Sequence, residues 1–321
     1  MIVSKRRMAS IVVLALVAGT AGLTVAGPAD KAGKGPLKVF ILAGQSNMQG
    51  AGLIKLNPER NEGKGSLEYM VKDPEMAGRT RHLLDADGHW VVRKDVWIWY
   101  FDRKGGLSVG YGARTTTIGP EFGFGHGVGE ALDEQVLLIK TAWGGKSLAK
   151  DFRPPSSGGE IGPYYKKMLE HVTSVLGDIK AHFPAYDGRG YELVGFAWHQ
   201  GWNDRVNQAH NDAYEGNMVH FIHDVRKALG KKDLPFVIAE TGMSGHEEKH
   251  PRALSLMRAQ AAVAEHEEFK GNVAFVGTKD FYRPKEESPS GQAYHWNSNA
   301  ETYFLIGDGM AQAMLTLLNE Q

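Results

Sequence analysis

The sequence predicts a three-layer α/β/α sandwich built around a five-stranded parallel sheet. Strand-like hydrophobic runs alternate with helical segments along the chain, which is typical of βαβ units. The runs are continuously apolar, as expected of parallel strands buried on both faces. Several end in glycine-rich or polar turns, and right-handed crossovers bring such ends to one edge of the sheet. With 321 residues, 42% of them hydrophobic, the chain is long enough for one large domain.

The first residues have the composition of a targeting segment. A positive stretch at residues 5–7 precedes an apolar run at 11–18 and a small-residue cleavage site at 24–26. The sequence therefore predicts a signal peptide over residues 1–26 and a secreted or periplasmic protein without membrane attachment after cleavage. A retained anchor is the alternative, although the apolar run is short for a bilayer. Residues 27–36, rich in glycine and lysine, are predicted to form a flexible tether before the main domain.

The charge balance and the lack of cysteine exclude several classes of function. Lys plus Arg and Asp plus Glu both number 37, so the formal net charge is zero with neutral histidines. Nothing in this balance indicates a nucleic-acid partner. Without cysteine, the chain has no disulfide, no thiolate catalysis and no cysteine-ligated metal.

The first predicted strand, residues 37–43, ends at Gly44 and is followed by a small polar cluster. Gln45, Ser46 and Asn47 lie just past the carboxyl end of this strand, where open α/β sheets bind their ligands. The residues alone leave two interpretations open. The cluster is either a helix N-cap, which Ser and Asn favour, or a turn that presents a nucleophilic serine.

Residues 50–118 are irregular, and only short runs at 91–92 and 96–101 have the composition of strands. The stretch is too long for an ordinary loop. We interpret it as an insertion in the domain that spans residues 37–321. It either forms part of the wall of the site or is a plain surface excursion.

A predicted helix at residues 119–133 begins with Pro and Glu, and its glycines lack the G-x-G-x-x-G spacing of dinucleotide-binding turns. The second strand, residues 136–142, is followed by Gly144-Gly145-Lys146-Ser147. A phosphate-binding loop is excluded there, because it requires glycine at the position that Lys140 occupies.

The remaining elements are predicted from apolar periodicity. The third strand, residues 193–198, runs directly into a polar segment, residues 199–204. His295 lies just before the last helix. The other predicted strands are 236–240 and 273–277, and the other helices are 164–183, 209–229, 253–266 and 300–318.

Residues 246–250 match the zinc-binding pattern H-E-x-x-H letter for letter. In a zinc peptidase both histidines share one face of a helix. Here Gly245 precedes the pattern and Pro251 follows it, and neither residue suits a helix interior. We therefore predict a solvated charged loop and no metal site.

Four separated blocks resemble those of the SGNH hydrolases. Gly44-Gln45-Ser46-Asn47-Met48 is similar to their first block, most of all in the sialate O-acetylesterase-like branch that includes carbohydrate esterase family 6. Residues 144–148 resemble the second block and residues 201–204 the third, G-x-N-D. His295 stands where the family keeps its base. The branch more often has W-x-Q-G-E in the third block, and here Trp202 replaces that Glu.

The resemblance implies a fold and a set of roles. It implies a flavodoxin-like strand order, 2-1-3-4-5, with Ser46 as nucleophile and His295 as base. The backbone N–H of Ser46, the backbone N–H of Gly145 and the side-chain amide of Asn203 are expected to hold the oxyanion. Gly144 is an almost equal alternative to Gly145, and Gln200 is an alternative to Asn203. Gln45, Gln200 and Trp202 are expected to contact substrate. No cofactor and no metal is expected.

The fourth block departs from the family pattern, D-x-x-H, because Gln292 stands three residues before His295. A neutral Gln cannot stabilise imidazolium as a carboxylate does. Either a displaced carboxylate serves as the acid or the site is a Ser–His dyad. The candidates for a displaced acid are Asp280, Glu286 and Glu287, and we favour a displaced acid over the dyad.

The function expected from the resemblance is a secreted serine esterase that removes O-acetyl groups from carbohydrates, either acetylated polysaccharide or sialic acid. Trp143, Trp202 and Trp296 each adjoin a block, and aromatic faces pack well on sugar rings, although core packing is commoner. Two alternatives stay open. One is a non-catalytic carbohydrate-binding protein on a degenerate scaffold, and the other is a secreted lipase or thioesterase.

Overall fold

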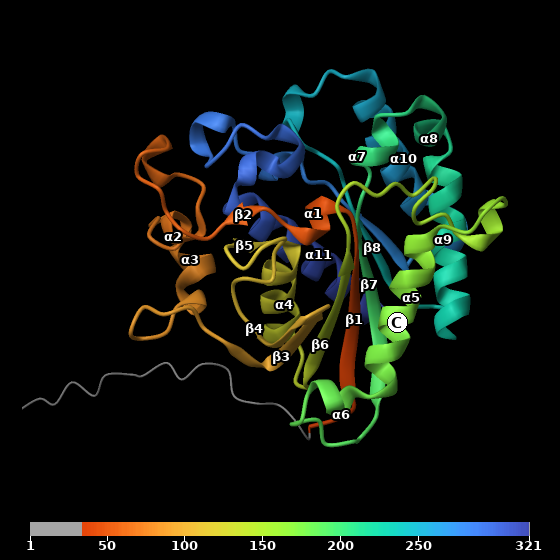
Figure 1. Cartoon of the computed structure of the whole chain (residues 1–321), viewed down its shortest axis with the longest axis horizontal. Helices are drawn as coiled ribbons and strands as arrows, with labels where there is room; N and C mark the ends of the chain where they lie inside the picture. The colour runs from red at the N-terminus through yellow and green to blue at the C-terminus, as the bar shows by residue number, and fades with distance from the viewer. Residues whose placement is uncertain (1–33, 321) are drawn as a thin grey trace, which may run out of the picture.

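The computed structural model describes residues 34–320. The predicted signal peptide, and residues 27–33 of the predicted tether, lie outside the described residues. The described chain folds around one mixed sheet with helices on both faces, which confirms the predicted three-layer α/β/α architecture (Figure 1). No helix within residues 34–320 is long and apolar enough to cross a lipid bilayer.

The central sheet has seven strands in the order β4-β3-β6-β1-β7-β8-β9. The predicted order of the five parallel strands is confirmed, because they correspond to β6-β1-β7-β8-β9. Their bounds are β1 Leu37–Gly44, β6 Val136–Ala142, β7 Tyr191–His199, β8 Phe236–Ala239 and β9 Val273–Val276.

Two further strands come from the predicted insertion and extend the sheet beyond the five expected strands. β3 (Arg93–Tyr100) pairs in parallel with β6, and β4 (Arg103–Leu107) pairs antiparallel with β3. The sequence showed the strand-like composition of 96–101 but not its partner, because the pairing joins segments about 40 residues apart in the chain. A small separate sheet joins β2 (Gly52–Leu53) to β5 (Thr117–Ile118).

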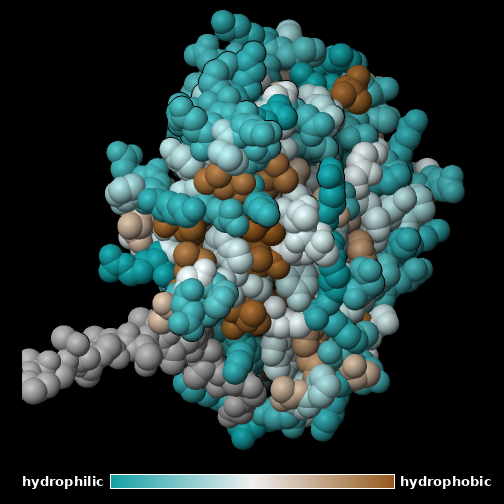
Figure 2. Space-filling view, turned by 60° about the vertical axis from the view of Figure 1, so that its left-hand side comes forward, coloured by the Kyte–Doolittle hydropathy of each residue, from teal (hydrophilic) through white to brown (hydrophobic). Residues whose placement is uncertain are grey.

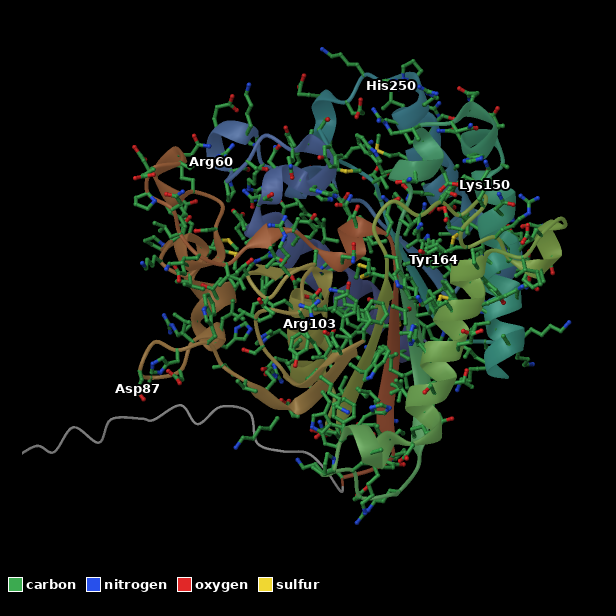
Figure 3. All side chains as sticks on the ribbon, in the orientation of Figure 1. Arg60, Asp87, Arg103, Lys150, Tyr164 and His250 are labelled. Carbon is green, nitrogen blue, oxygen red and sulfur yellow. The ribbon has the colours of Figure 1, made fainter. Side chains whose placement is uncertain are left out.

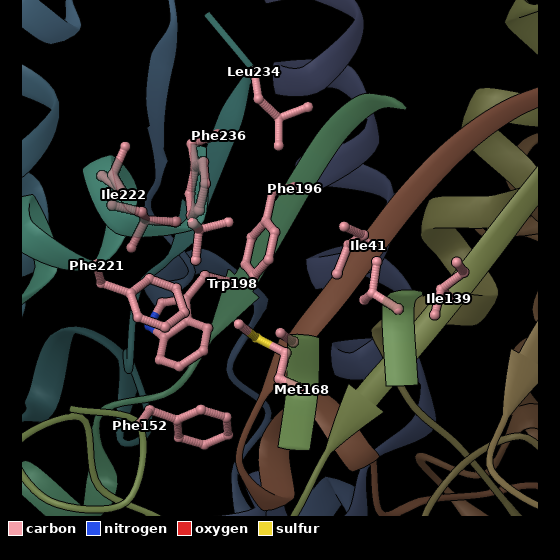
Figure 4. Packing of buried hydrophobic residues seen from close by; sticks show 14 of the residues in the cluster. Ile41, Ile139, Phe152, Met168, Phe196, Trp198, Phe221, Ile222, Leu234 and Phe236 are labelled. Atoms are coloured by element: carbon pink, nitrogen blue, oxygen red, sulfur yellow. The ribbon is translucent and has the colours of Figure 1, made fainter. Parts of the chain in front are cut away.

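Alternate residues of β1 face the two sides of the sheet, as the two-residue period of a strand requires. Val39 and Ile41 pack in one hydrophobic cluster, and Phe40 and Leu42 pack in the other. The first cluster buries residues of α5 (Pro163–Gly177), α9 (Tyr214–Leu229) and α10 (Pro251–Glu265), and Figure 4 shows part of it around Trp198, Phe196 and Phe221. The second cluster buries residues of α4 (Pro120–Ala131) and α11 (Ala300–Asn319).

Two predicted helices are each broken in the structure. The helix expected at 164–183 ends at Gly177, and α6 (Ile179–His182) begins after Asp178, whose carboxylate accepts a hydrogen bond from the N–H of Ala181. The helix expected at 209–229 is α8 (Gln208–Asp212) followed by α9. Neither break alters the apolar period of its segment, so periodicity alone missed both.

The remaining helices are short. The α-helices are α1 (Ser46–Gln49), α2 (Leu67–Met70), α3 (Ala77–Thr80) and α7 (Trp202–Arg205). The 3₁₀ turns are Asn61–Gly63, Arg81–Leu83, Pro155–Ser157, Gly245–Glu247, Glu267–Phe269, Lys279–Phe281, Lys285–Glu287 and Ala293–Ser298. Figure 2 brings the side of α2 and α3 forward and shows patches of hydrophobic side chains between hydrophilic ones there.

Candidate active site

The carboxyl end of β1 brings three of the predicted blocks together. Gly44 pairs with Ala142 of β6 on one side and with His199 of β7 on the other. The segments that follow these three strands therefore start side by side at the same edge of the sheet. A Cβ at Gly44 would lie 2.2 Å from the carbonyl oxygen of His199, so only glycine fits at this point.

Ser46 is the first residue of α1, and its side chain is half-buried. The helix has no side-chain cap, so the N-cap interpretation of this polar cluster is wrong. Among the described residues, the Ser46 hydroxyl makes one hydrogen bond, which it accepts from Gln45 Nε2 at 3.5 Å. A serine hydroxyl with so little internal bonding, at the start of a helix and at a sheet edge, is available for chemistry.

Gln45 is the hub that aligns the first block with the third. Its Oε1 accepts hydrogen bonds from Gly201 N and Asn203 N, both at 3.2 Å, and from Gln200 Nε2 at 3.3 Å. Its Nε2 donates to Asn203 Oδ1 at 3.3 Å. Gln45 and Gln200 are only 2% and 1% exposed. Both side chains are therefore buried where they hold the first and third blocks in place. Their predicted contact with substrate remains a prediction.

The second block is held against the third by Asn203 and Asp204. Asn203 Nδ2 donates to the Gly145 carbonyl at 2.9 Å. The buried Asp204 carboxylate accepts hydrogen bonds from Leu148 N and Ala149 N, both at 2.8 Å, and from Gln200 Nε2 at 2.6 Å. Burial raises the pKa of Asp204 to about 6, and its hydrogen bonds oppose that rise.

The geometry provides donors for an oxyanion next to Ser46. Ser46 N and Gly145 N donate no hydrogen bond within residues 34–320, and Asn203 has a second amide hydrogen that no protein group accepts. Gly145 has φ +70°, in the region that favours glycine, and a Cβ there would meet nothing within 4 Å. A Cβ on Gly144 would lie 3.8 Å from Ser46 Cβ, so Gly144 also lies beside the serine. Both glycines therefore stay candidates for the second donor.

His295 lies on a backbone segment of unusual conformation just before α11. Trp296, Asn297 and Ser298 follow it with φ of 50°, 52° and 58°. Each left-handed residue costs on the order of 1–3 kcal/mol, so the surrounding structure must hold this segment. Ser290 N donates to the Asn297 carbonyl at 2.9 Å, and Asn297 Nδ2 donates to the Arg283 carbonyl at 3.0 Å.

Two buried residues tie this segment to α1. Asn47 Nδ2 donates to the Tyr294 carbonyl at 3.2 Å, and Asn47 Oδ1 accepts from the Tyr303 hydroxyl at 3.0 Å. The Tyr303 hydroxyl also lies 3.4 Å from the His295 carbonyl. The backbone that carries His295 is thereby fixed to the helix that carries Ser46. Sequence reasoning placed Asn47 in the polar cluster but missed its role and that of Tyr303, because neither role leaves a local signal.

No carboxylate among the described residues pairs with His295. Asp280 instead lies 2.7 Å from His246 Nε2, and Glu286 lies 3.8 Å from Lys285 Nζ. Asp280 and Glu287 line a separate cleft of about 640 Å³ that contains neither Ser46 nor His295. The Gln292 side chain is exposed, and its carbonyl accepts from His295 N at 2.8 Å. The displaced acid that we expected is therefore absent from this geometry, which favours a dyad.

Partial burial and the nearby Arg114 guanidinium both lower the pKa of His295. A lowered pKa keeps the imidazole neutral at moderately acidic pH, as a general base requires. Arg114 is exposed on the loop between β4 and β5. The charge of Arg114, in the predicted insertion, therefore acts on His295 in the site.

The three tryptophans near the blocks have different surroundings. Trp296 is 0% exposed, so it is a core residue and cannot stack on a sugar. Trp143 is packed among other rings, with centroids of Phe101 at 5.1 Å and Tyr164 at 5.2 Å. Trp202 is half-buried, with the Tyr294 ring at 5.8 Å and the Arg205 guanidinium 4.2 Å from its centroid. Trp202 and the exposed Tyr294 are thus the aromatic pair beside His295 that is available to a ligand.

The H-E-x-x-H pattern lies on a turn and a loop and not within a helix, as predicted from its neighbours. Residues 245–247 form a 3₁₀ turn, and α10 begins only at Pro251. His250 caps α10, accepting from Arg252 N at 3.2 Å, and lies on the loop before that helix in Figure 3. Among residues 34–320, the one group spaced to hold a metal ion is Asp85, Asp87 and His89, which are all exposed.

Comparison with known proteins shows which family the chain belongs to. A family model described as "Carbohydrate esterase, sialic acid-specific acetylesterase" matches residues 36–316. The chain belongs to this family. Its members are carbohydrate acetylesterases, so the protein is a carboxylic ester hydrolase. No curated protein matches the chain.

Three solved structures, one of them of a carbohydrate acetylesterase, have a fold similar to that of this family member. NanS is similar with a TM-score of 0.54 at 14% identity, covering 89% of this chain and 99% of that chain. A protein from Arabidopsis thaliana, AT4G34215, has a TM-score of 0.56 at 17% identity and covers 87% of this chain and 98% of its own. XAC1771, a carbohydrate acetylesterase from Xanthomonas citri, has a TM-score of 0.50 at 14% identity, and the match spans 86% of this chain but 55% of that one.

Proposed function

We propose that this family member is a secreted serine esterase that removes O-acetyl groups from carbohydrates, with Ser46 as nucleophile and His295 as base. The observation that carries the proposal is the hydrogen-bond hub at Gln45. It aligns the block of Ser46 with that of Asn203, and Asn203 binds the carbonyl of Gly145. Such preorganisation is what stabilises the transition state of acyl transfer.

The proposed reaction has two steps. Ser46 Oγ attacks the ester carbonyl as His295 accepts its proton, and the carbonyl oxygen becomes an oxyanion. Backbone N–H groups of Ser46 and of Gly145 or Gly144, with the Asn203 amide, hold that oxyanion, and one such donor contributes about 3 kcal/mol. The ester bond then breaks, and the sugar hydroxyl leaves with the proton from His295. Water, deprotonated by His295, then attacks the acetyl–Ser46 ester, the bond to Oγ breaks to release acetate, and His295 returns the proton to Ser46 Oγ.

The deciding experiment is Ser46→Ala. Acetate release should be lost while the melting temperature stays nearly unchanged, and a fluorophosphonate should label only the wild type. Labelling of the Ala variant at the wild-type level, or retained turnover, would remove Ser46 from the mechanism. Acetate release from acetylated xylan, acetylated pectin and O-acetylated sialic acid would identify the substrate. Faster cleavage of long-chain esters or thioesters than of acetyl esters would support the lipase or thioesterase alternative instead.

The proposed location rests on the amino-terminal pattern over residues 1–26. Expression of the full chain in a bacterial host should deliver the mature protein outside the cytoplasm, starting near Gly27. A product in the cytoplasm that retains residues 1–26 would refute secretion without affecting the assignment of the esterase.

A further inference from the structure

A buried ion pair lies directly beneath the helix that carries Ser46. Lys140 of β6 and Glu121 of α4 both have fully buried side chains, and Lys140 Nζ lies 2.6 Å from Glu121 Oε2. Lys140 Nζ also donates to the carbonyl oxygens of Gln49 and Tyr111, both at 2.7 Å. All three ammonium hydrogens therefore have protein acceptors, which a buried charge requires.

The bond to Gln49 connects Lys140 to the catalytic helix. Gln49 is the last residue of α1, a helix of four residues that starts at Ser46. A helix this short has little stability of its own, so its position depends on contacts to the rest of the fold. The Gln49 side chain adds a second link, donating to the Tyr100 hydroxyl at 3.0 Å. A Cβ on Gly144 would lie 3.0 Å from Gln49 Oε1, so Gln49 also adjoins the second block.

The other two partners connect Lys140 to the neighbouring wall of the site. Tyr111 is on the loop that also carries Arg114, and Arg103 pins this loop by donating to the carbonyls of Gly110 at 2.6 Å and Gly112 at 2.8 Å. Figure 3 shows Arg103, the first residue of β4, near the middle of the molecule. Glu121 accepts from Gly119 N at 2.8 Å at the start of α4. One ammonium group thus joins α1, the loop of the insertion and α4.

We propose that Lys140 is a positioning residue for the esterase reaction, and that its charged form holds Gln49, and through α1 the Ser46 hydroxyl, in the reactive place. Glu121 acts with it by keeping the ammonium charged. The inference rests on the proposed role of Ser46. No local pattern indicates this role, because the partners of Lys140 lie far from it in the sequence.

The surroundings of Lys140 bring its pKa close to the pH range in which an esterase works. Burial lowers the pKa of Lys140 to about 8, the attraction of Glu121 opposes that fall, and the Arg103 charge adds to it. The other titratable groups that face it are tyrosines. Burial raises the pKa of Tyr100, whose ring lies 4.6 Å from Nζ, to about 12, and it also raises the pKa of Tyr111, so both stay neutral.

Deprotonation of the Lys140 ammonium should lower kcat without lowering the free energy of unfolding. A neutral amine has one donor fewer, and it leaves the Glu121 carboxylate buried without a counter-charge, so the bond to Gln49 weakens. Because the folded pKa lies below the unfolded value of 10.5, the unfolded chain binds more protons between these values. This group therefore makes the fold more stable, not less, as pH rises through that window. An alkaline fall in kcat that precedes any fall in Tm is the expected signature.

The test uses two variants and one control. Lys140→Met/Glu121→Gln replaces the pair with neutral groups of similar size, which buried ion pairs often tolerate. It should fold, lower kcat about 10²-fold with little change in KM, and lack the alkaline fall near pH 8. Glu121→Gln alone removes the attraction and should move that fall to lower pH. Lys166→Met, on the exposed face of α5, should match the wild type.

Each outcome decides between the proposals. If Ser46→Ala abolishes turnover but both variants keep the wild-type kcat and pH profile, the inference about Lys140 is overturned and the proposed function stands. If Ser46→Ala keeps turnover, the proposed function is wrong, and the inference about Lys140 falls with it. If the double variant does not fold, the pH profiles of kcat and Tm for Glu121→Gln and the wild type test the inference. An alkaline fall in kcat that coincides with unfolding, or one that Glu121→Gln leaves in place, contradicts the inference.

Discussion

Asn47 Nδ2 donates a hydrogen bond to the Tyr294 carbonyl across 247 positions of the sequence, at 3.2 Å. The bond joins the residue after the proposed nucleophile to the residue before the proposed base. Asn47 is 2% exposed, and its Oδ1 is held by the Tyr303 hydroxyl at 3.0 Å, so the donor has a fixed direction. The Asn47 amide therefore helps to fix the position of His295 relative to Ser46.

Asn47→Ala should lower kcat by about 10²-fold, because a displacement of 1 Å between reacting groups costs roughly that much. The left-handed residues after His295 would lose one of the bonds that hold them. The measurement is acetate release with purified enzyme, together with Tm to verify folding. Asn57→Ala, on the exposed loop after β2, is the matched control and should keep full activity. Wild-type kcat in Asn47→Ala would show that the segment is held without this bond.

Arg114→Gln should move the acid side of the pH profile of kcat/KM to higher pH. Burial and then the Arg114 charge lower the pKa of His295, and removing the charge lets that pKa rise. A higher pKa protonates the base at a higher pH and so removes activity there. Because Arg114 is exposed, the difference from wild type should shrink in high salt. Arg60→Gln, on the outer part of the insertion in Figure 3, should leave the profile in place. A shift in the opposite direction would contradict this electrostatic role.

Asp280→Asn, Glu286→Gln and Glu287→Gln should each turn over within a few-fold of the wild type. None of these carboxylates pairs with His295 in the structure. The loss of a true triad acid costs about 10⁴-fold, so the two cases are easily distinguished. Gln292→Asp should raise activity, since it places a carboxylate where the family carries one. A loss near 10⁴-fold in any one neutralised variant would restore the displaced acid.

His199→Phe should make the fold less sensitive to acid. Burial lowers the pKa of His199 from 6.5 to about 4, with a weak hydrogen bond to the Ala239 carbonyl opposing it. Above pH 6.5 His199 is neutral in both the folded and the unfolded chain and does not destabilise the fold. As pH falls from 6.5 towards 4, the unfolded chain takes up the proton first, so the free energy of unfolding decreases. This loss amounts to about 3 kcal/mol for the wild type. Urea unfolding at pH 7 and pH 4 should show a smaller difference in the variant. An equal difference in both proteins would assign the acid sensitivity elsewhere, for example to buried His126.

The sequence by itself determined the parallel strands, and the resemblance added their order and the position of the four blocks. Continuous apolar runs mark buried strands, and glycine and polar residues mark their ends, because these signals depend on the residues of one segment. The roles of Ser46, Gly145 and Asn203 came from the resemblance. The interpretation of the H-E-x-x-H pattern as a loop was also local, since Gly245 and Pro251 adjoin it.

Only the tertiary structure decided how distant segments meet. It added β3 and β4 to the sheet, left His295 without the carboxylate we expected, and placed Lys140 beneath α1. The bonds from Lys140 to Gln49 and from Asn47 to Tyr294 span 91 and 247 positions. A side chain that bonds across such a separation has no fixed spacing to its partner. Local pattern therefore finds the blocks of the site, and long-range packing decides the groups that hold them in place.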